Sequence, residues 1–210
     1  MLRQLKAVFA PVPLGEAELM ADPQTTWTRL LGDIAEARRE VLIENYILLD
    51  GDAADALLSA LAAAAERGAR IRVTIDGAGS YQLSARLRRR LDEVGELRIY
   101  HPLRFGALFG GLHTRLLRRT HRRLVVIDGT IGWTVGIAVE DPWWPAPGRV
   151  AVRDTMARVT GEPAAQLQAA FDQLWREELP APEVIVAPIG RVVAGSDDEQ
   201  RILLLPINLF

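Results

Sequence analysis

The sequence predicts an α/β domain in which a mixed, mostly parallel β-sheet is flanked by helices on both faces, as an α-β-α sandwich. Two observations predict this fold. Apolar runs typical of buried strands alternate with segments of helical periodicity from residue 25 to residue 100. Further along the chain, the turn dipeptide Asp128-Gly129 separates two more apolar runs.

The first part of the chain predicts three helices that alternate with three strands. Each helical segment places apolar residues three and four positions apart, and Gly68 and Gly95 end the second and third of them. In order, we expect a helix over 25–40 with threonine at its N-terminal cap, a strand over 41–49, a helix over 52–69, a strand over 70–77, a helix over 80–95 and a strand over 96–102.

The later part predicts a β-hairpin, a strand and a helix. We expect two strands over 122–139 around the Asp128-Gly129 turn, a strand over 149–161, and a helix over 162–179 with Pro163 in its first turn. The composition shifts after residue 180. The predicted organisation is an N-terminal extension over 1–24, an α/β domain over 25–180 and a separate segment over 181–210.

Composition excludes several kinds of protein. The 210 residues contain no cysteine, which excludes disulfides and thiolate metal sites. No apolar run approaches the 18 residues of a membrane-spanning helix, and prolines and early acidic residues make residues 1–20 a poor signal peptide. The net charge of −2 indicates no global preference for nucleic acid or for an anionic surface. These features predict a cytoplasmic protein.

A basic segment lies between Glu96 and Asp128. It contains seven arginines, all three histidines and no acidic residue, with large apolar residues interleaved. Arginine beside phenylalanine suits a surface that contacts anionic lipid headgroups, and the same composition can hold a nucleic-acid backbone. A solvated loop whose apolar residues pack in the core is a third interpretation. The candidates for membrane contact are Arg104, Phe105, Phe109 and Arg115.

His121 and Arg123 stand two positions apart at the start of a predicted strand, so their side chains point to the same face. A neutral imidazole can attack phosphorus, and an adjacent cation neutralises the phosphate oxygens. Spacing alone leaves a catalytic and an ordinary surface histidine both open. In earlier strands, Glu44 and Tyr46 are expected to pack in the core, and residues 76–80 to form a strand-end turn near the site.

The segment "THRRLVVIDGTIGWTVGIAVED", residues 120–141, resembles the motif of the phospholipase D superfamily, His-x-Lys-x4-Asp followed by Gly-Gly/Ser-x-Asn. Flanking segments such as "RREVLIENYIL" are similar to the first half of bacterial cardiolipin synthases, and the resemblance covers residues 16–180. It implies a two-step phosphodiester exchange through a phosphohistidine, without metal or cofactor, in a site that two motif-bearing halves share. It further implies an anionic, phosphatidylglycerol-like phospholipid as substrate, met peripherally at the inner face of the cell membrane.

Carried over by position, the resemblance makes His121 the catalytic histidine and places Arg123 where the family has its phosphate-binding lysine. Asp128 is the motif aspartate, a support for the turn, and Asp154 is the acidic residue that orients the histidine ring. The substrate-binding candidates are Arg118, Arg119 and Gly136. Two positions depart from the motif: arginine replaces the compact ammonium of lysine, and Ala138 stands where the family has asparagine and cannot donate a hydrogen bond.

Three functions remain open at this point. The first is a phospholipase D-like phosphatidyltransferase or phosphodiesterase whose site is completed by a homodimer or by a separate second half, because residues 190–210 resemble only the beginning of such a half. The second is a catalytically degenerate half that binds phospholipid without turnover. The third is a dimeric, nuclease-like phosphodiesterase, although the flanking segments favour lipid over nucleic acid.

Overall fold

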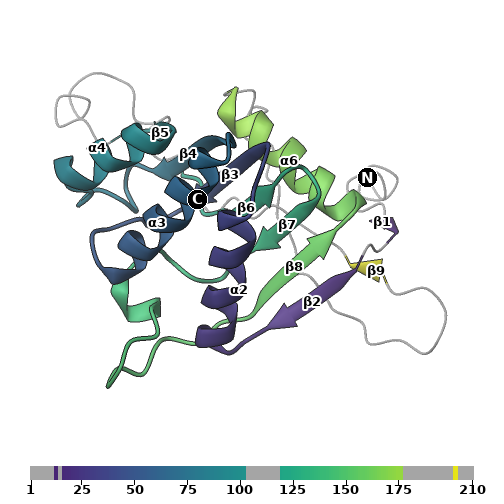
Figure 1. Ribbon diagram of the computed structural model, residues 1–210, viewed down its shortest axis with the longest axis horizontal. Helices are drawn as coiled ribbons and strands as arrows, with labels where there is room; N and C mark the ends of the chain where they lie inside the picture. The colour runs from purple at the N-terminus through teal and green to yellow at the C-terminus, as the bar shows by residue number, and fades with distance from the viewer. Residues whose placement is uncertain (1–11, 14–15, 103–118, 177–200, 203–210) are drawn as a thin grey trace, which may run out of the picture.

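The computed structural model of the chain describes residues 12–13, 16–102, 119–176 and 201–202, whose helices and strands are drawn in Figure 1. The elements are β1 (Val12–Pro13), β2 (Ala17–Met20), α2 (Pro23–Ala35), β3 (Glu40–Asn45), α3 (Asp52–Glu66), β4 (Arg70–Asp76), α4 (Ala85–Val94), β5 (Glu96–Tyr100), β6 (Leu124–Ile127), β7 (Ile131–Thr134), the short 3-10 helix η2 (Asp141–Trp143), β8 (Met156–Thr160), α6 (Glu162–Trp175) and β9 (Arg201–Ile202).

A seven-stranded sheet forms the centre of the domain, in the order β2-β8-β7-β6-β3-β4-β5. β3, β4 and β5 run parallel to one another, whereas the β3–β6, β6–β7, β7–β8 and β2–β8 pairs are antiparallel. The predicted mixed α/β fold is confirmed. The expectation of a mostly parallel sheet is wrong beyond β5, where every strand pair is antiparallel. For β6 and β7 the reason is the short connection over residues 128–130, since parallel neighbours need a crossover of a dozen or more residues.

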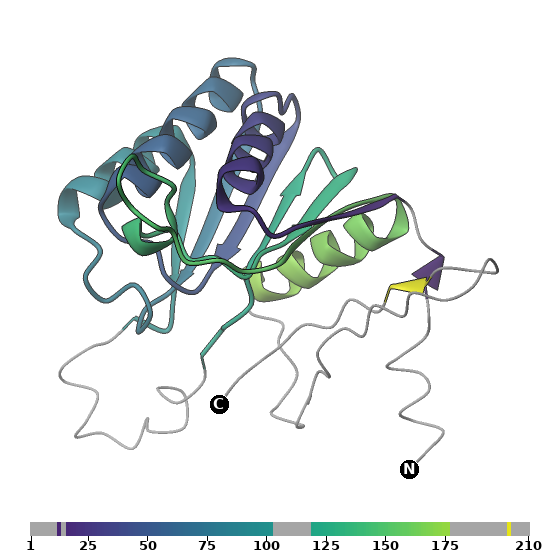
Figure 2. The same ribbon diagram turned by 90° about the horizontal axis from the view of Figure 1, so that it is seen from below.

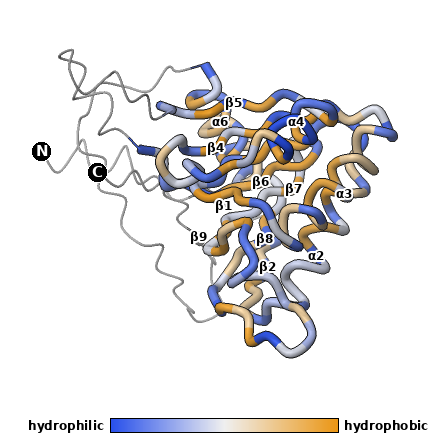
Figure 3. Tube along the Cα trace, turned by 90° about the vertical axis from the view of Figure 1, so that its left-hand side faces the viewer, coloured by the Kyte–Doolittle hydropathy of each residue, from blue (hydrophilic) through white to orange (hydrophobic). Residues whose placement is uncertain are grey.

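Helices cover both faces of the sheet, as the sandwich predicts. Among the described helices, Figure 2 shows α2, α3 and α4 on one side of the sheet and α6 on the other. The larger core cluster lies under the three helices and includes Trp27, Ile34, Leu61, Ile75 and Trp133, all at most 2% exposed. A smaller cluster of Leu42, Val126, Phe171 and Trp175 packs beneath α6. In Figure 3, hydrophobic segments run through the central strands and α3, whereas α4 is largely hydrophilic.

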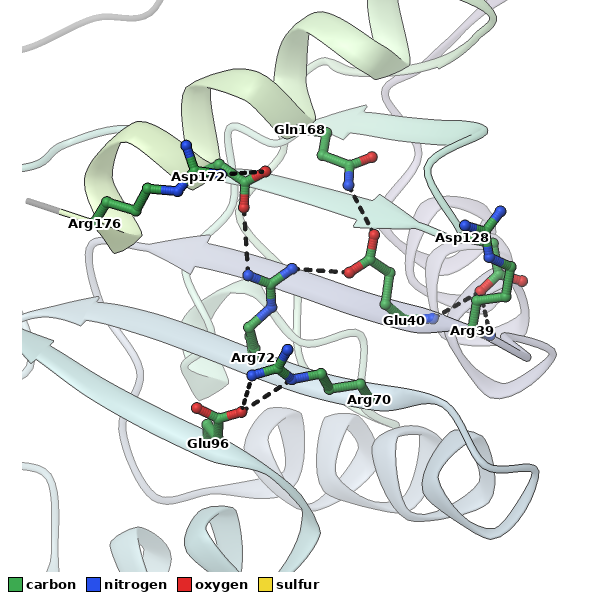
Figure 4. Close-up of polar contacts among 9 residues, drawn as sticks. All are labelled: Arg39, Glu40, Arg70, Arg72, Glu96, Asp128, Gln168, Asp172 and Arg176. Carbon is green, nitrogen blue, oxygen red and sulfur yellow. Dashed lines mark hydrogen bonds and ion pairs between the residues drawn. The ribbon is translucent and has the colours of Figure 1, made fainter. Parts of the chain in front are cut away.

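Polar side chains tie α6 to the sheet, as Figure 4 shows. Arg72 of β4 donates from Nη2 to Glu40 Oε2 at 2.8 Å and from Nη1 to Asp172 Oδ1 at 3.3 Å. Gln168 of α6 donates to the other oxygen of Glu40 at 2.8 Å. This network crosses from β4 over β3 to α6, so it fixes the helix on the sheet beside the apolar side chains of its buried face.

Local capping sets where the helices begin. α2 begins after Asp22, whose Oδ2 accepts from the Thr25 backbone N–H at 2.8 Å. The predicted threonine cap is therefore wrong: Thr25 donates to the cap residue, and Pro23 occupies the first helical turn. α4 begins after Ser84, whose hydroxyl accepts from Leu87 N at 3.0 Å. Pro163 lies in the first turn of α6, as predicted.

Both ends of the chain contribute strands. β2, within the predicted extension over 1–24, pairs with β8 at one edge of the sheet. β1 pairs with β9, which belongs to the segment over 181–210, and the two form a separate ribbon. The helices that the structure describes are all too short or too polar to cross a membrane.

Candidate active site

The segment 119–123 crosses the sheet at the carboxyl ends of β3 and β4, just before β6 begins at Leu124. Its residues alternate in exposure: Thr120 and Arg122 are buried, whereas His121 and Arg123 are partly exposed. The predicted sharing of one face by His121 and Arg123 therefore matches the burial pattern, although the strand itself starts one residue after them.

The imidazole of His121 lies against the ring of Tyr46, with 4.5 Å between the ring centroids and 39° between the ring planes. Burial lowers the pKa of His121, and the positive charge of Arg123 lowers it further. The ring's contact with its own backbone and the charge of Asp76 oppose this shift without reversing it. His121 is consequently neutral, and able to act as a nucleophile, over a wider pH range than a free histidine.

Arg123 reaches across to the chain that follows β7. Its Nη1 donates a hydrogen bond to the Gly136 carbonyl, while its own carbonyl accepts from Val135 N at 3.0 Å. Burial lowers the pKa of Arg123, against the opposing charges of Asp154 and Glu140. The guanidinium thus lies beside His121 but is partly occupied by protein groups, and its phosphate-binding role stays a prediction.

Asp154 lies against Gly136, where a Cβ atom would collide with its carboxylate. Glycine at this position therefore permits the close approach of an acidic group to Arg123. Asp154 Oδ1 accepts from the backbone of its neighbour Thr155 at 2.7 Å. Within residues 119–176, the carboxylate of Asp154 makes no hydrogen bond to the His121 ring. The proposed role of Asp154 in orienting that ring therefore stays a prediction, and so does the substrate contact of Gly136.

Asp128 lies at the far end of β6 from His121, at the hairpin turn with φ of 53°. Its carboxylate accepts from the backbone N–H groups of Arg38, Arg39 and Glu40, at 2.7 to 3.2 Å. Burial raises the pKa of Asp128, but these three hydrogen bonds together outweigh it, and the net pKa is lowered. The contacts are those of a residue that joins the hairpin to the start of β3.

Several predicted positions are placed away from open solvent or lie outside the described residues. Ala138 is fully buried and Val135 is 8% exposed, so this part of the motif packs in the core. Arg119 Nη1 donates to the His101 carbonyl at 2.8 Å and lies 3.6 Å from Asp76 Oδ1; its substrate contact stays a prediction. The candidates that lie outside the described residues are Arg104, Phe105, Phe109, Arg115 and Arg118.

Glu44 is a site residue that the sequence interpretation missed. It is fully buried, as core packing predicts, but its carboxylate accepts from Arg122 Nε at 3.0 Å and from Arg122 Nη2 at 2.8 Å, with the Thr120 hydroxyl as a third donor. Burial raises the pKa of Glu44, and the charge of Arg122 opposes the shift. A carboxylate inside an apolar strand requires a buried partner, and this signal could have indicated the pair.

The residues 76–80 form a turn beside the site, as predicted. The fully buried Asp76 accepts from Ala78 N at 2.7 Å and from Gly79 N at 3.1 Å, which closes the turn. Ser80 donates from its hydroxyl to the Tyr46 carbonyl at 3.1 Å. The turn therefore supports the residue whose ring lies on His121. Within the described ranges, histidine and acidic side chains nowhere gather in a group of three that could hold a metal ion.

The fold and this motif segment define a phospholipase D-like domain. Comparison with known families matches residues 30–175 to the PLD-like domain of cardiolipin synthases, and the chain belongs to that family. Cardiolipin synthase B of Salmonella typhi is 31% identical over 152 residues, which cover 72% of this chain and 36% of that protein. Cardiolipin synthase of Alkalihalophilus pseudofirmus is 29% identical over 162 residues, 76% of this chain and 31% of that protein.

The chain spans about a third of the length of these curated relatives. Among solved structures, the phospholipase D family member Nuc of Salmonella typhimurium matches with a TM-score of 0.54 and 14% identity, over 77% of this chain and 94% of Nuc. NucT of Helicobacter pylori also matches with a TM-score of 0.54 and 14% identity, over 77% of this chain and 96% of NucT. These two structures confirm the fold.

Proposed function

We propose that the protein is a phosphatidyltransferase or phosphodiesterase that acts on phospholipid phosphodiesters through a phosphohistidine at His121. The observation that supports this most directly is the position of His121: a neutral imidazole, held against Tyr46, with the cation of Arg123 on the same face. Family membership and the names of its cardiolipin synthase relatives support phospholipid as the substrate class.

In the proposed reaction, a ring nitrogen of His121 attacks phosphorus, and the bond from phosphorus to the headgroup oxygen breaks as that oxygen takes a proton from a second acid. The phosphatidyl group is then carried on the histidine. The same second group removes a proton from an incoming alcohol, whose oxygen displaces the histidine. With phosphatidylglycerol as donor, a second phosphatidylglycerol gives cardiolipin, and water gives phosphatidic acid.

The second acid would come from another motif-bearing half. We propose His121 of a second copy of the chain, or a histidine of a separately encoded half, because the described residues bring no second histidine to the Tyr46 ring. In either case the reacting lipid is met at a membrane surface, and the basic segment around residues 104–115 is the proposed contact with anionic headgroups at the inner face of the cell membrane.

A degenerate, lipid-binding half is the second candidate, and the contacts of Arg123 favour it. Its guanidinium donates to the Gly136 carbonyl, and Ala138 at the asparagine position is buried and has no side-chain donor. Removal of a single donor to a developing charge costs about 3–4 kcal/mol of transition-state stabilisation, or roughly 100- to 1,000-fold in rate. Two such losses, one at Arg123 and one at Ala138, would leave a protein that binds phospholipid without turnover.

The test is incubation of the purified protein with phosphatidylglycerol vesicles, with products identified by mass spectrometry. The variants His121→Ala and Arg123→Lys are run in parallel, with phosphatidylcholine vesicles and single-stranded DNA as other substrates. Cardiolipin or phosphatidic acid that requires His121 supports the proposal. Product from Arg123→Lys alone supports the degenerate half, and cleavage of DNA but not lipid would contradict both.

A further inference from the structure

The chain on both sides of His121 is held by two fully buried carboxylates. Asp76, at the end of β4, accepts from Thr120 N at 3.0 Å, and its other oxygen lies 3.6 Å from Arg119 Nη1. Glu44, near the end of β3, accepts from the Thr120 hydroxyl and from both Nε and Nη2 of Arg122. The residues immediately before and after His121 are therefore both bound to the sheet.

This arrangement leaves the imidazole on the opposite side of the chain from the anchors. Thr120 and Arg122 are 1% and 6% exposed, and Arg122 also donates to the Ala170 carbonyl of α6 at 2.9 Å. His121 points instead to Tyr46, whose carbonyl accepts from Ser80. Both the backbone that carries the ring and the surface on which the ring rests are thus fixed.

We infer that Glu44 is a positioning residue for His121, acting through Arg122 and Thr120 rather than on a substrate. Stability alone explains the pair poorly, because an apolar pair of similar volume often serves a fold at least as well as a buried ion pair. A two-pronged carboxylate–guanidinium pair differs from an apolar contact in fixing direction as well as distance. Glu44 therefore holds the backbone at residues 120–122 in one position.

The test replaces both partners, with Glu44→Leu and Arg122→Met in one chain, so that neither charge is left buried and unpaired. The control is Glu40→Gln with Arg72→Met. Glu40 lies four residues earlier on the same strand, and its ion pair with Arg72 has the same 2.8 Å separation but belongs to the network of Figure 4. The readout is the NMR signal of the imidazole Hε1 proton, assigned to His121 by its loss in His121→Ala.

In the unmodified protein, we expect a His121 signal shifted by the Tyr46 ring and a titration below the usual histidine value. In the Glu44→Leu/Arg122→Met variant, we expect the chemical shift and the titration of His121 to move toward the values of a free histidine. In the control variant, we expect neither quantity to change. Thr120→Val removes only the hydroxyl donor to Glu44 and shifts the signal in the same direction by less. The Thr120→Val variant alone tests the positioning role of Glu44 if the Glu44→Leu/Arg122→Met variant does not fold.

The inference is overturned if the signal and titration of His121 stay unchanged in the test variants, or move equally in the control. Its catalytic consequence rests on the proposed function: where turnover is observed, we expect the test pair to lower kcat about 100-fold with KM unchanged, because a misplaced nucleophile loses alignment rather than binding. Absence of turnover in the unmodified protein would count against the proposed function alone, since the NMR readout does not require it.

Discussion

Replacement of Arg72 by alanine removes the side chain that connects β4 to β3 and α6 (Figure 4). Its guanidinium makes two charge-assisted hydrogen bonds, to Glu40 and to Asp172. It also lies 5.5 Å from the ring centre of Phe171 and 5.6 Å from that of Trp175, and the side chain is 12% exposed. The substitution thus removes hydrogen bonds, ring contacts and part of the packing under α6.

The expected loss of unfolding free energy follows from these contacts. A hydrogen bond to a charged group contributes about 1.5–3 kcal/mol, and a partly shielded cation–ring contact about 0.5–1 kcal/mol. Glu40 and Asp172 are 18% and 23% exposed and keep other partners, Gln168 and Arg176, so the sum lies toward its lower end. With two contacts of each kind, that lower end is about 4 kcal/mol. We therefore expect a loss of about 4 kcal/mol, or a fall in Tm of about 8–16 °C for a domain of this size.

Scanning calorimetry and urea unfolding measure this loss, and Arg70→Ala is the matched control. Arg70 lies two residues earlier on the same face of β4, and its ion pair with Glu96 is shorter, 2.6 Å, but both side chains are at least half exposed. Solvent screens such a pair, so we expect no measurable change in Tm. Equal effects of the two substitutions, or a Tm unchanged by Arg72→Ala, would refute the argument that burial determines what an ion pair contributes here.

Three further predictions concern the site and its supports. Since burial lowers the pKa of His121, the unfolded chain binds more protons, and unfolding free energy should fall as pH drops below the ordinary value of 6.5; urea unfolding of His121→Gln should lack this slope. Asp128→Asn leaves one acceptor oxygen for three N–H donors, so urea unfolding should show a loss of about 1–2 kcal/mol, with the His121 titration unchanged. Gly136→Ala should lower Tm through collision with Asp154, and Asp154→Ala in the same chain should recover most of it; additive losses in calorimetry would contradict that contact.

The sequence predicted the elements whose signals are local. The helix over Asp52–Glu66 and the hairpin at Asp128-Gly129 were both predicted, because helical periodicity and turn chemistry depend on residues a few positions apart. The direction of β6 against β3 was not predicted, because the chain between β5 and β6 carries no pattern that sets a crossover. β2 was also missed, because four residues with one buried side chain carry no readable alternation.

The candidate site likewise has features that the local sequence predicted and features that it did not. The shared face of His121 and Arg123 follows from a spacing of two residues, and the family resemblance follows from a short motif with its flanks. The pairing of Arg119 and Arg122 with buried carboxylates was not predicted, because the acidic partners lie far away in the sequence.

By itself, then, the sequence determined the α/β class, the family and the histidine at its centre, all of which are written in nearby residues. Only the tertiary structure decided that Glu44 and Asp76 hold the chain on either side of that histidine, and that Tyr46 supports its ring. The physical reason is distance along the chain. These partners are 44 to 78 positions apart, and the cost of burying each carboxylate is offset only once the sheet brings its donors within hydrogen-bonding range.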